Sequence, residues 1–336
     1  MPQALPKNHV VCAIDSQMTY GLAVLFSSLA RTASTRVHVT VGYLAETLSP
    51  QDRRFLASLS DTLHLPLTFL PLPSNPLFIT QGHISPTTFA KFLLADAIPE
   101  AHLWIDADAV ALPGWDQVFE SIHAATPKTG LVVAARGKDN DRPRSQEGEG
   151  LRFNAGVLGW PAGARRDWLT PLAVMEDVAT QEQALFNQLY GDSAQTVSEA
   201  FNTLTYRLER LIPSQLPAII HFAGAHKPWH LPRQLKHVCM EYRCPWAAWF
   251  DAEAELADML TNNPLLEHLT HYQRLARKTG RFSWRRDHTG LRLAKTLALM
   301  GPLAPIAVRL LRLVAQWVPR GTHPLHPLKT SQRRSQ

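Results

Sequence analysis

The first two thirds of the chain alternate short apolar runs with amphipathic stretches, and this order limits the folds that the chain can adopt. The apolar runs predict strands at residues 10–14, 36–41, 67–70, 102–105 and 131–135, with further strand segments at 151–160 and 218–222. Helical periodicity predicts helices at residues 20–32, 50–63, 87–97, 115–124 and 181–190. Strands that alternate with helices form a mostly parallel sheet covered by helices, so we expect an α/β sandwich.

Length and composition narrow the class of protein further. The chain has 336 residues, 45% of them apolar and 18% charged, which is typical of a globular protein with a full core and excludes global disorder. Cys12, Cys239 and Cys244 are few and have no CxxC spacing, so we expect neither a disulfide framework nor a zinc knuckle, and a reducing compartment. No apolar stretch reaches the roughly 20 residues that a membrane-spanning helix needs.

The charge of the chain is divided unevenly. Residues 268–336 contain fourteen Lys plus Arg and one acid, a net charge of +13 that leaves −7 for residues 1–267. Arginines and tryptophans among leucines are typical of a helix that lies on an anionic membrane surface; the alternative is a helical subdomain with a solvated basic face. We expect an α/β domain at 1–231, a connecting segment at 232–267 and a basic amphipathic tail at 268–336. No recognition motif for nucleic acid accompanies the charge.

Two acids directly follow one of the predicted strands. Asp106 and Asp108 lie two residues apart after the apolar run at 102–105. Residues at i and i+2 share a face of extended chain, so both carboxylates can meet beyond the carboxyl edge of the sheet, where open α/β sheets bind ligands. Carboxylate oxygens suit Mg²⁺, Mn²⁺ or Ca²⁺. A solvated turn after a strand is the alternative interpretation of these acids alone.

A second polar group follows the predicted strand at 218–222. His221 comes after an apolar run, Gly224 lets the backbone approach a ligand closely, and Lys227 adds a cation three positions later. An imidazole added to the two carboxylates would favour Mn²⁺ over Mg²⁺. The alternative is a core histidine with a surface lysine.

Polar residues also interrupt two apolar patterns. Asn154 and Gly156 lie in the apolar segment at 151–160, where Gly indicates a bulge or a close ligand and a buried Asn needs partners, either sugar hydroxyls or neighbouring backbone. Glu182 and Gln183 open the predicted helix at 181–190. Taken singly, each is most simply an exposed residue of the first helical turn.

Six segments in this order resemble glycosyltransferase family 8, a family of retaining, metal-dependent transferases that includes bacterial lipopolysaccharide galactosyl- and glucosyltransferases. The segments are DSQMTYGLAV, HISPTTFAKFLLADAIP, LWIDADAV, FNAGVLGW, TQEQALFN and HFAGAHKPWH, and they extend over some two thirds of the chain. The resemblance implies the GT-A fold, a Rossmann-like α/β sandwich that binds a nucleotide sugar at the carboxyl edge of its sheet, over residues 1–231.

The resemblance also implies roles for individual residues. Asp106, Asp108 and His221 match the family's Mn²⁺ ligands. Glu182 and Gln183 match the pair beside the anomeric carbon, so the residues expected at the reaction centre are Glu182, Gln183, Asn154 and Lys227. The residues expected to contact the donor are Ala13, Asp15, Met18, Lys91, Asp106, Ala107, Asp108, Asn154, Gly156, Gly224 and Lys227.

Three residues depart from the family's pattern. Lys91 stands where the family usually has Arg, Glu182 where it has Asp, and Met18 where an aromatic ring often stacks on uracil. Lys replaces a bidentate fork by a point charge, and Glu extends its carboxylate by one methylene. Met can still cover a ring face. These changes leave the expected metal ligands intact and leave the choice of hexose open.

The resemblance implies a hexosyltransferase with Mn²⁺, or Mg²⁺ in its place, as cofactor. The expected reaction moves galactose or glucose from a UDP-sugar to a hydroxyl of a cell-envelope glycolipid such as a lipopolysaccharide core. The basic tail would place the protein in the cytoplasm, peripherally on the inner face of the membrane. The alternatives are a protein or soluble-sugar acceptor, and a non-catalytic nucleotide-sugar-binding protein.

Overall fold

The protein is described from a computed structural model. The described residues are 8–79, 85–126, 130–134, 152–175, 181–205, 216–225, 227–231, 236–237, 239–240, 246–280, 299–300, 303 and 306. The polar segment at 136–150, whose turn-forming residues predict a long loop, and nearly all of the tail after residue 280 lie outside them. Within the described part, none of the helices is both long enough and apolar enough to cross a bilayer.

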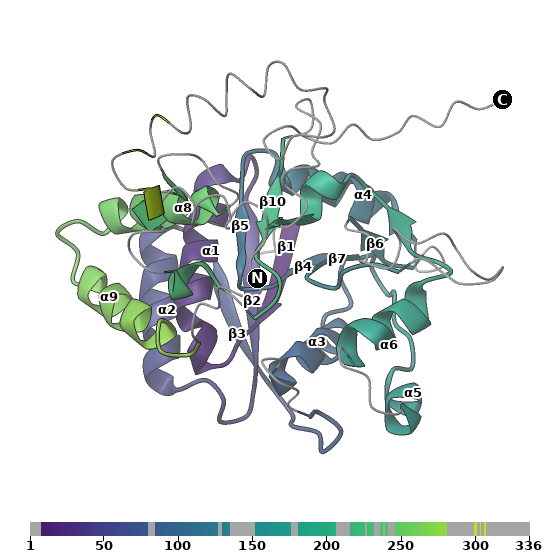
Figure 1. The fold of residues 1–336 in the computed structure, drawn as a ribbon. Helices are drawn as coiled ribbons and strands as arrows, with labels where there is room; N and C mark the ends of the chain where they lie inside the picture. The colour runs from purple at the N-terminus through teal and green to yellow at the C-terminus, as the bar shows by residue number, and fades with distance from the viewer. Residues whose placement is uncertain are drawn as a thin grey trace, which may run out of the picture.

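A seven-stranded sheet in the order β3-β2-β1-β4-β7-β6-β8 forms the centre of the protein (Figure 1). Its strands are β1 (Asn8–Ala13), β2 (Val37–Leu44), β3 (Leu67–Leu72), β4 (His102–Ile105), β6 (Val132–Val133), β7 (Val157–Trp160) and β8 (Gln195–Thr196). Strands β1 to β4 pair in parallel, as do β6 and β8, whereas β7 is antiparallel to both β4 and β6. The predicted α/β class with a mostly parallel sheet is confirmed.

Helices cover both faces of this sheet. They are α1 (Thr19–Thr32), α2 (Pro50–Thr62), α3 (Ala90–Ala97), α4 (Val118–Ala124), α5 (Leu169–Val174) and α6 (Gln181–Tyr190). Short 3-10 turns are η1 (Ser16–Met18), η2 (Pro86–Phe89), η3 (Trp115–Gln117), η6 (Glu199–Asn202) and η8 (Pro228–His230). The predicted helices at 87–97 and 115–124 therefore begin as 3-10 turns. Alternate residues of β1 face opposite sides: Val10 packs with α1, and Val11 packs with α3.

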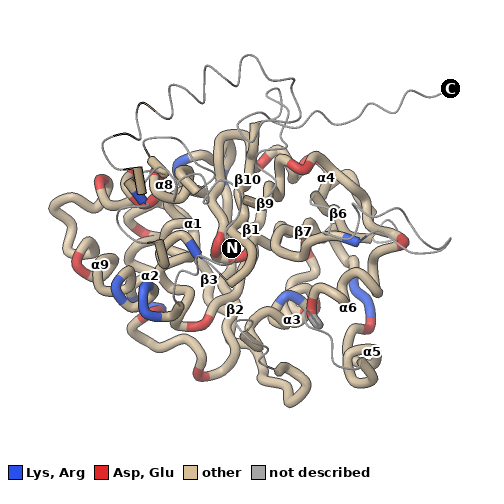
Figure 2. Tube along the Cα trace, in the orientation of Figure 1, with Lys and Arg blue, Asp and Glu red and all other residues tan. Residues whose placement is uncertain are grey.

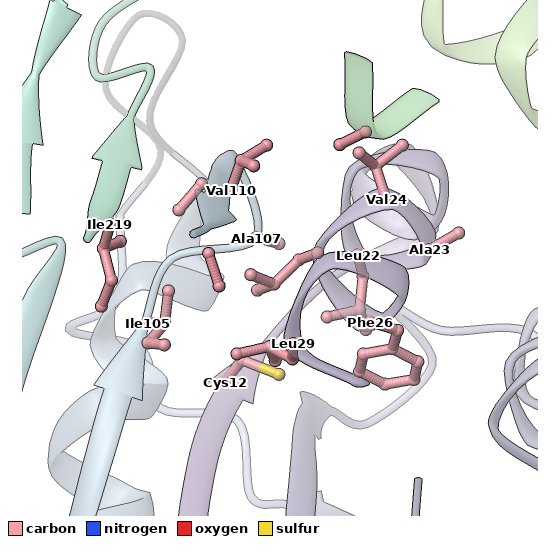
Figure 3. Packing of buried hydrophobic residues seen from close by; sticks show 14 of the residues in the cluster. Cys12, Leu22, Ala23, Val24, Phe26, Leu29, Ile105, Ala107, Val110 and Ile219 are labelled. Carbon is pink, nitrogen blue, oxygen red and sulfur yellow. The ribbon is translucent and has the colours of Figure 1, made fainter. Parts of the chain in front are cut away.

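A second, three-stranded sheet brings distant parts of the chain together. It has the order β5-β10-β9, with β5 (Ala109–Ala111), β9 (Thr203–Leu204) and β10 (Ile219–His221). β10 is antiparallel to β5, and His221 pairs with Ala109. Apolar side chains of this sheet belong to the same buried cluster as α1, and Figure 3 shows Val110 on the α1 side of this cluster and Ile219 farther from α1. The pairing places His221 beside the residue that follows Asp108.

Two further helices complete the core beside α1. They are α8 (Ala247–Met259) and α9 (Leu265–Ala276), and Figure 1 shows both on the α1 and α2 side of the sheet. Trp249 of α8 and Tyr272 of α9 are buried in the same cluster as Val10. The hydroxyl of Tyr20 in α1 donates to the carboxylate of Glu253 in α8. The predicted boundary at 267/268 falls inside α9, and the division of the chain into three parts stays a prediction.

The structure shows the state of two cysteines and how charged residues are distributed over the described part. Cys12 is a buried free thiol, whereas Cys239 is disulfide-bonded. A single bridge is not a disulfide framework, and the expected reducing compartment stays a prediction. Absence of a CxxC spacing excludes a knuckle motif but not a single bridge. Charges of both signs are spread over the described part, as Figure 2 shows, in keeping with a basic excess that belongs to the tail.

Candidate active site

Two carboxylates and one imidazole converge at the carboxyl end of β4. Nε2 of His221 lies 3.7 Å from Oδ2 of Asp106 and 3.4 Å from Oδ1 of Asp108. One ligand atom from each of the three residues lies within 4.8 Å of the others, and no other such group exists among the described residues. Two carboxylate oxygens and an imidazole nitrogen form a donor set that suits a divalent metal ion.

Backbone contacts on both sides fix the Asp106–Asp108 loop. The Asp106 N–H donates to the carbonyl oxygen of Gly156 at 2.8 Å, and the Phe222 N–H donates to the carbonyl oxygen of Asp108 at 2.9 Å. The indole N–H of Trp104 also donates to Oδ1 of Asp106 at 2.7 Å. The loop is therefore tied both to the start of β7 and to the end of β10, which keeps the three candidate ligands together.

Gly156 leaves the space that the imidazole ring occupies. A Cβ at this position would lie 2.0 Å from Cε1 of His221, far closer than any carbon contact allows. Any side chain here would therefore push His221 away from the two carboxylates. The missing side chain of Gly156 thus leaves room for the imidazole of His221 at the position where it can join Asp106 and Asp108 as a metal ligand.

Lys227 adds a positive charge on the far side of Asp108. Its ammonium contacts Oδ2 of Asp108 and donates to the carbonyl oxygen of Phe222 at 3.2 Å. Between them, Gly224 has a φ of 102°, a left-handed conformation that suits glycine and turns the chain back. Burial would raise the pKa of Asp108, but the neighbouring Lys227 and His221 outweigh burial and hold it well below its ordinary value.

Lys91 connects Asp106, one of the three candidate metal ligands, with Glu182 of helix α6. Its side chain is only 2% exposed, its ammonium contacts the carboxylate of Glu182, and it lies 3.3 Å from Oδ1 of Asp106. Burial would lower the pKa of Lys91, but Asp106 and Glu182 raise it above its ordinary value. Burial raises the pKa of Glu182 against the opposing charge of Lys91. Lys91 therefore stays charged between two carboxylates.

Asn154 and Gln183 form one hydrogen-bonded unit. Nδ2 of Asn154 donates to Oε1 of Gln183 at 3.1 Å, and the Ala155 N–H donates to the same oxygen at 3.3 Å. Asn187 ties the same two segments together, because its Oδ1 accepts from the Phe153 N–H at 2.7 Å and its Nδ2 donates to the carbonyl oxygen of Gln183 at 2.9 Å.

The residues expected at the base of the nucleotide lie where β1 meets α1. Ala13 ends β1, and Oδ1 of Asp15 accepts from the Gln17 N–H at 3.0 Å, capping η1. A Cβ on Gly21 of α1 would lie 2.8 Å from the carbonyl oxygen of Ala107 and 3.3 Å from Cε of Met18. Met18 and Ala107 therefore approach the same point of α1, and the base-binding roles of these residues stay predictions.

Comparison with models of known protein families identifies the family to which the chain belongs. The model for "Glycosyl transferase family 8" matches residues 9–231. The chain belongs to glycosyltransferase family 8. The resemblance of the six sequence segments is thereby confirmed, as is the prediction that the protein is a glycosyltransferase.

The known proteins that the chain resembles differ from it widely in sequence. General stress protein A of Bacillus subtilis (strain 168) is 21% identical in an alignment of length 254 that covers 66% of this chain and 87% of that protein. Glycosyltransferase GlyD of Streptococcus pneumoniae serotype 4 is 27% identical in an alignment of length 173 that covers 44% of this chain but only 20% of GlyD. The galactosyltransferase LgtC, solved with donor and acceptor sugar analogues, is 19% identical with a TM-score of 0.58, covering 78% of this chain and 99% of that chain. This last likeness supports the GT-A fold.

One residue at the centre of the site of this family 8 chain was not predicted from the sequence. Asn202, at the end of η6, is 1% exposed and contacts both Asn154 and His221. It lies outside the six segments, and its only sequence signal is a polar amide beside Phe201 in a short apolar stretch. The structure brings the expected residues from β4, β7, α3, α6 and β10 into one place, and their functional roles stay predictions.

Proposed function

We propose that the protein transfers a hexose, galactose or glucose, from a UDP-sugar to a hydroxyl of a cell-envelope glycolipid such as a lipopolysaccharide core, with Mn²⁺ as cofactor. The observation that supports this most is the convergence of Asp106, Asp108 and His221 beside Lys227, at the carboxyl edge of the sheet in a family 8 fold. A site of this kind suits a ligand that combines a diphosphate with a sugar.

The charges of the site match the charge that develops when the donor is cleaved. Breaking the anomeric C–O bond leaves negative charge on the diphosphate, and a divalent ion held by Asp106, Asp108 and His221 would neutralise part of it. Lys227 is placed to neutralise more of it, because its ammonium lies at Asp108. In the absence of the diphosphate, Asp108 is its partner.

The hydrogen bonds around α6 favour attack by the acceptor on the same face from which UDP leaves. Oε1 of Gln183 accepts two hydrogen bonds, from Asn154 and from the Ala155 N–H, so this oxygen is poorly placed to act as a nucleophile. Glu182 is paired with buried Lys91. The departing phosphate oxygen would take the acceptor's proton. Mass spectrometry of the protein with a UDP-hexose tests this step, and a hexosyl adduct on Glu182 or Gln183 would contradict it.

The charge of the tail supports a membrane location and, with it, a glycolipid acceptor. A net charge of +13 over residues 268–336 suits attachment to an anionic membrane surface, where a glycolipid acceptor is presented. Deletion of residues 281–336 should abolish sedimentation with vesicles of anionic lipid while leaving UDP-hexose cleavage in solution intact. A shortened chain that still sediments with these vesicles would refute membrane attachment through the tail.

A product assay separates the candidate acceptors. The protein with Mn²⁺ is incubated with UDP-galactose or UDP-glucose and with a lipopolysaccharide core, a peptide or a soluble sugar, and the products are analysed by mass spectrometry and NMR. We expect transfer to the lipopolysaccharide core with the anomeric configuration of the donor retained. Transfer only to the peptide or the soluble sugar would contradict the proposed glycolipid acceptor. Absence of transfer from both donors would contradict the proposed reaction.

A further inference from the structure

A chain of side-chain amides links helix α6 with His221. Oε1 of Gln183 accepts from Nδ2 of Asn154 at 3.1 Å, and Oδ1 of Asn154 accepts from Nδ2 of Asn202 at 3.1 Å. Oδ1 of Asn202 then lies 3.2 Å from Nδ1 of His221. Asn202 is 1% exposed and His221 is 3% exposed, so water does not replace these partners.

Backbone N–H groups fix the direction of every amide in this chain. The Gly156 N–H donates to Oδ1 of Asn154 at 3.0 Å, and the Ala155 N–H donates to Oε1 of Gln183 at 3.3 Å. A backbone N–H can only donate, so these two side-chain atoms must be oxygens. The group of Asn202 that faces the Asn154 oxygen must then be its NH₂, and its oxygen must face His221.

The direction of the amides determines the tautomer of the imidazole. Because the oxygen of Asn202 can only accept, Nδ1 of His221 must be protonated, and in the neutral ring Nε2 then has a lone pair. That lone pair faces Asp106 and Asp108 at 3.7 Å and 3.4 Å. Three acceptor atoms that face one another repel unless a cation lies between them.

We propose that Asn202 is a positioning residue that holds His221 as the Nδ1–H tautomer and so keeps its Nε2 available to a divalent metal ion. The proposal rests on the proposed metal site and extends it to a residue that is not one of the three candidate ligands. Through Asn154, the same residue joins the metal site to Gln183, so the amides order both parts of the site at once. If Asn202 had a purely structural role, its replacement would lower the stability of the protein but would not change the tautomer of His221.

The tautomer can be measured directly on the whole protein. Long-range ¹H–¹⁵N spectra of protein labelled with ¹⁵N-histidine are recorded at pH 9 without metal, and His221 is assigned with His221→Gln. Mn²⁺ affinity is measured by calorimetry with Mn²⁺ alone. Asn202→Leu removes both hydrogen bonds and keeps the branched shape of the side chain. Thr203→Val is the matched control, because this neighbouring buried hydroxyl donates to the Glu199 and Ala200 carbonyl oxygens and not to the site.

We expect the Nδ1–H tautomer in the wild type and in Thr203→Val. Asn202→Leu should show a mixture with the Nε2–H tautomer and an Mn²⁺ affinity about 10- to 100-fold weaker, the range typical for lost partners of metal-binding histidines. A wild-type Nε2–H tautomer would overturn the proposal. So would Asn202→Leu with the wild-type tautomer and an unchanged affinity.

Two features keep the test decisive. If Asn202→Leu does not fold, the wild-type spectrum still tests the proposal, because an Nε2–H tautomer there would overturn it. Asn202→Asp keeps an acceptor for the Nδ1–H of His221 and should therefore keep the wild-type tautomer. Neither measurement uses a UDP-sugar. A protein with the expected tautomer that releases no UDP would therefore contradict the proposed function and leave the role of Asn202 standing.

Discussion

The ammonium of Lys91 is buried against the carboxylate of Glu182, a residue 91 positions later in the chain, and it also lies 3.3 Å from Asp106. Lys91→Met should destabilise the protein by about 3–5 kcal/mol, because two carboxylates lose their buried counter-charge. The double variant Lys91→Met/Glu182→Gln should lose less than Lys91→Met alone, since only the partly exposed carboxylate of Asp106 is then left without its counter-charge. Urea unfolding measures both, and a double variant as unstable as the sum of the single ones would contradict the coupling.

Gly156→Ala should remove metal binding more than it removes stability. The added Cβ would meet the His221 ring at 2.0 Å, so the ring must leave its place beside the carboxylates. We expect a loss of about 1–3 kcal/mol of stability from overpacking and no measurable Mn²⁺ binding by calorimetry.

Gly159→Ala, three residues further along the chain and within β7, is the control for overpacking. Its Cβ would lie 2.6 Å from Cγ1 of Ile122 and does not approach His221. It should destabilise the protein to a similar extent and still bind Mn²⁺. If Gly156→Ala and Gly159→Ala bind Mn²⁺ equally well, Gly156 does not form the cradle of the imidazole.

Three buried histidines on neighbouring strands should make the fold sensitive to acid. His9 and His38 have ring centroids 5.1 Å apart, and His9 and His102 are 6.4 Å apart. Burial, followed by the charges of His38 and His102, lowers the pKa of His9 to about 3, and burial lowers the pKa of His102 to about 4 and that of His38 below its ordinary value.

The sign of the effect follows from these lowered pKa values. Below about pH 6.5 the histidines of the unfolded chain bind protons, whereas the buried histidines of the folded chain do not. The free energy of unfolding is therefore highest above this pH and decreases as the pH falls towards 4. At pH 5 the loss should be about 2 kcal/mol for each of His9 and His102. Urea unfolding between pH 7.5 and 5 checks this. His102→Gln should flatten the dependence, whereas His64→Asn, at an exposed position, should not; equal slopes in all three proteins would refute the explanation.

The sequence predicted the parts of the site whose partners are local. Asp106 and Asp108 are recognisable because they follow a strand at a spacing of two, and the strand itself is a continuous apolar run. The pairing of Lys91 with Glu182, and the contact of Asn202 with His221, join residues far apart in the chain and depend on tertiary packing. An apolar run also has no direction, so the antiparallel orientation of β7 could not be predicted.

The helices after residue 231 should be necessary for the catalytic fold. The side chains that α8, α9 and the preceding residue bury in the core with α1 are Trp246, Trp249, Phe250, Leu256, Leu269 and Tyr272. Their burial stabilises the fold by on the order of 10 kcal/mol, which is comparable to the whole stability of a domain. A chain ending at Leu231 should therefore lack a cooperative thermal transition by circular dichroism, and a chain ending at Gly280 should retain it. A cooperative transition in the shorter chain would show that the two helices are dispensable.

The most direct test of the account is metal-dependent UDP release. Wild-type protein and Asp108→Ala are incubated with UDP-galactose or UDP-glucose, with Mn²⁺ or with a chelator, and free UDP is measured. We predict release by the wild type with Mn²⁺, none with the chelator, and at least a hundredfold slower release by Asp108→Ala, on the order of the effect of losing one main electrostatic contact in a transition state. Equal release by the wild type and Asp108→Ala, or release that the chelator leaves unchanged, would contradict the role assigned to Asp106, Asp108 and His221.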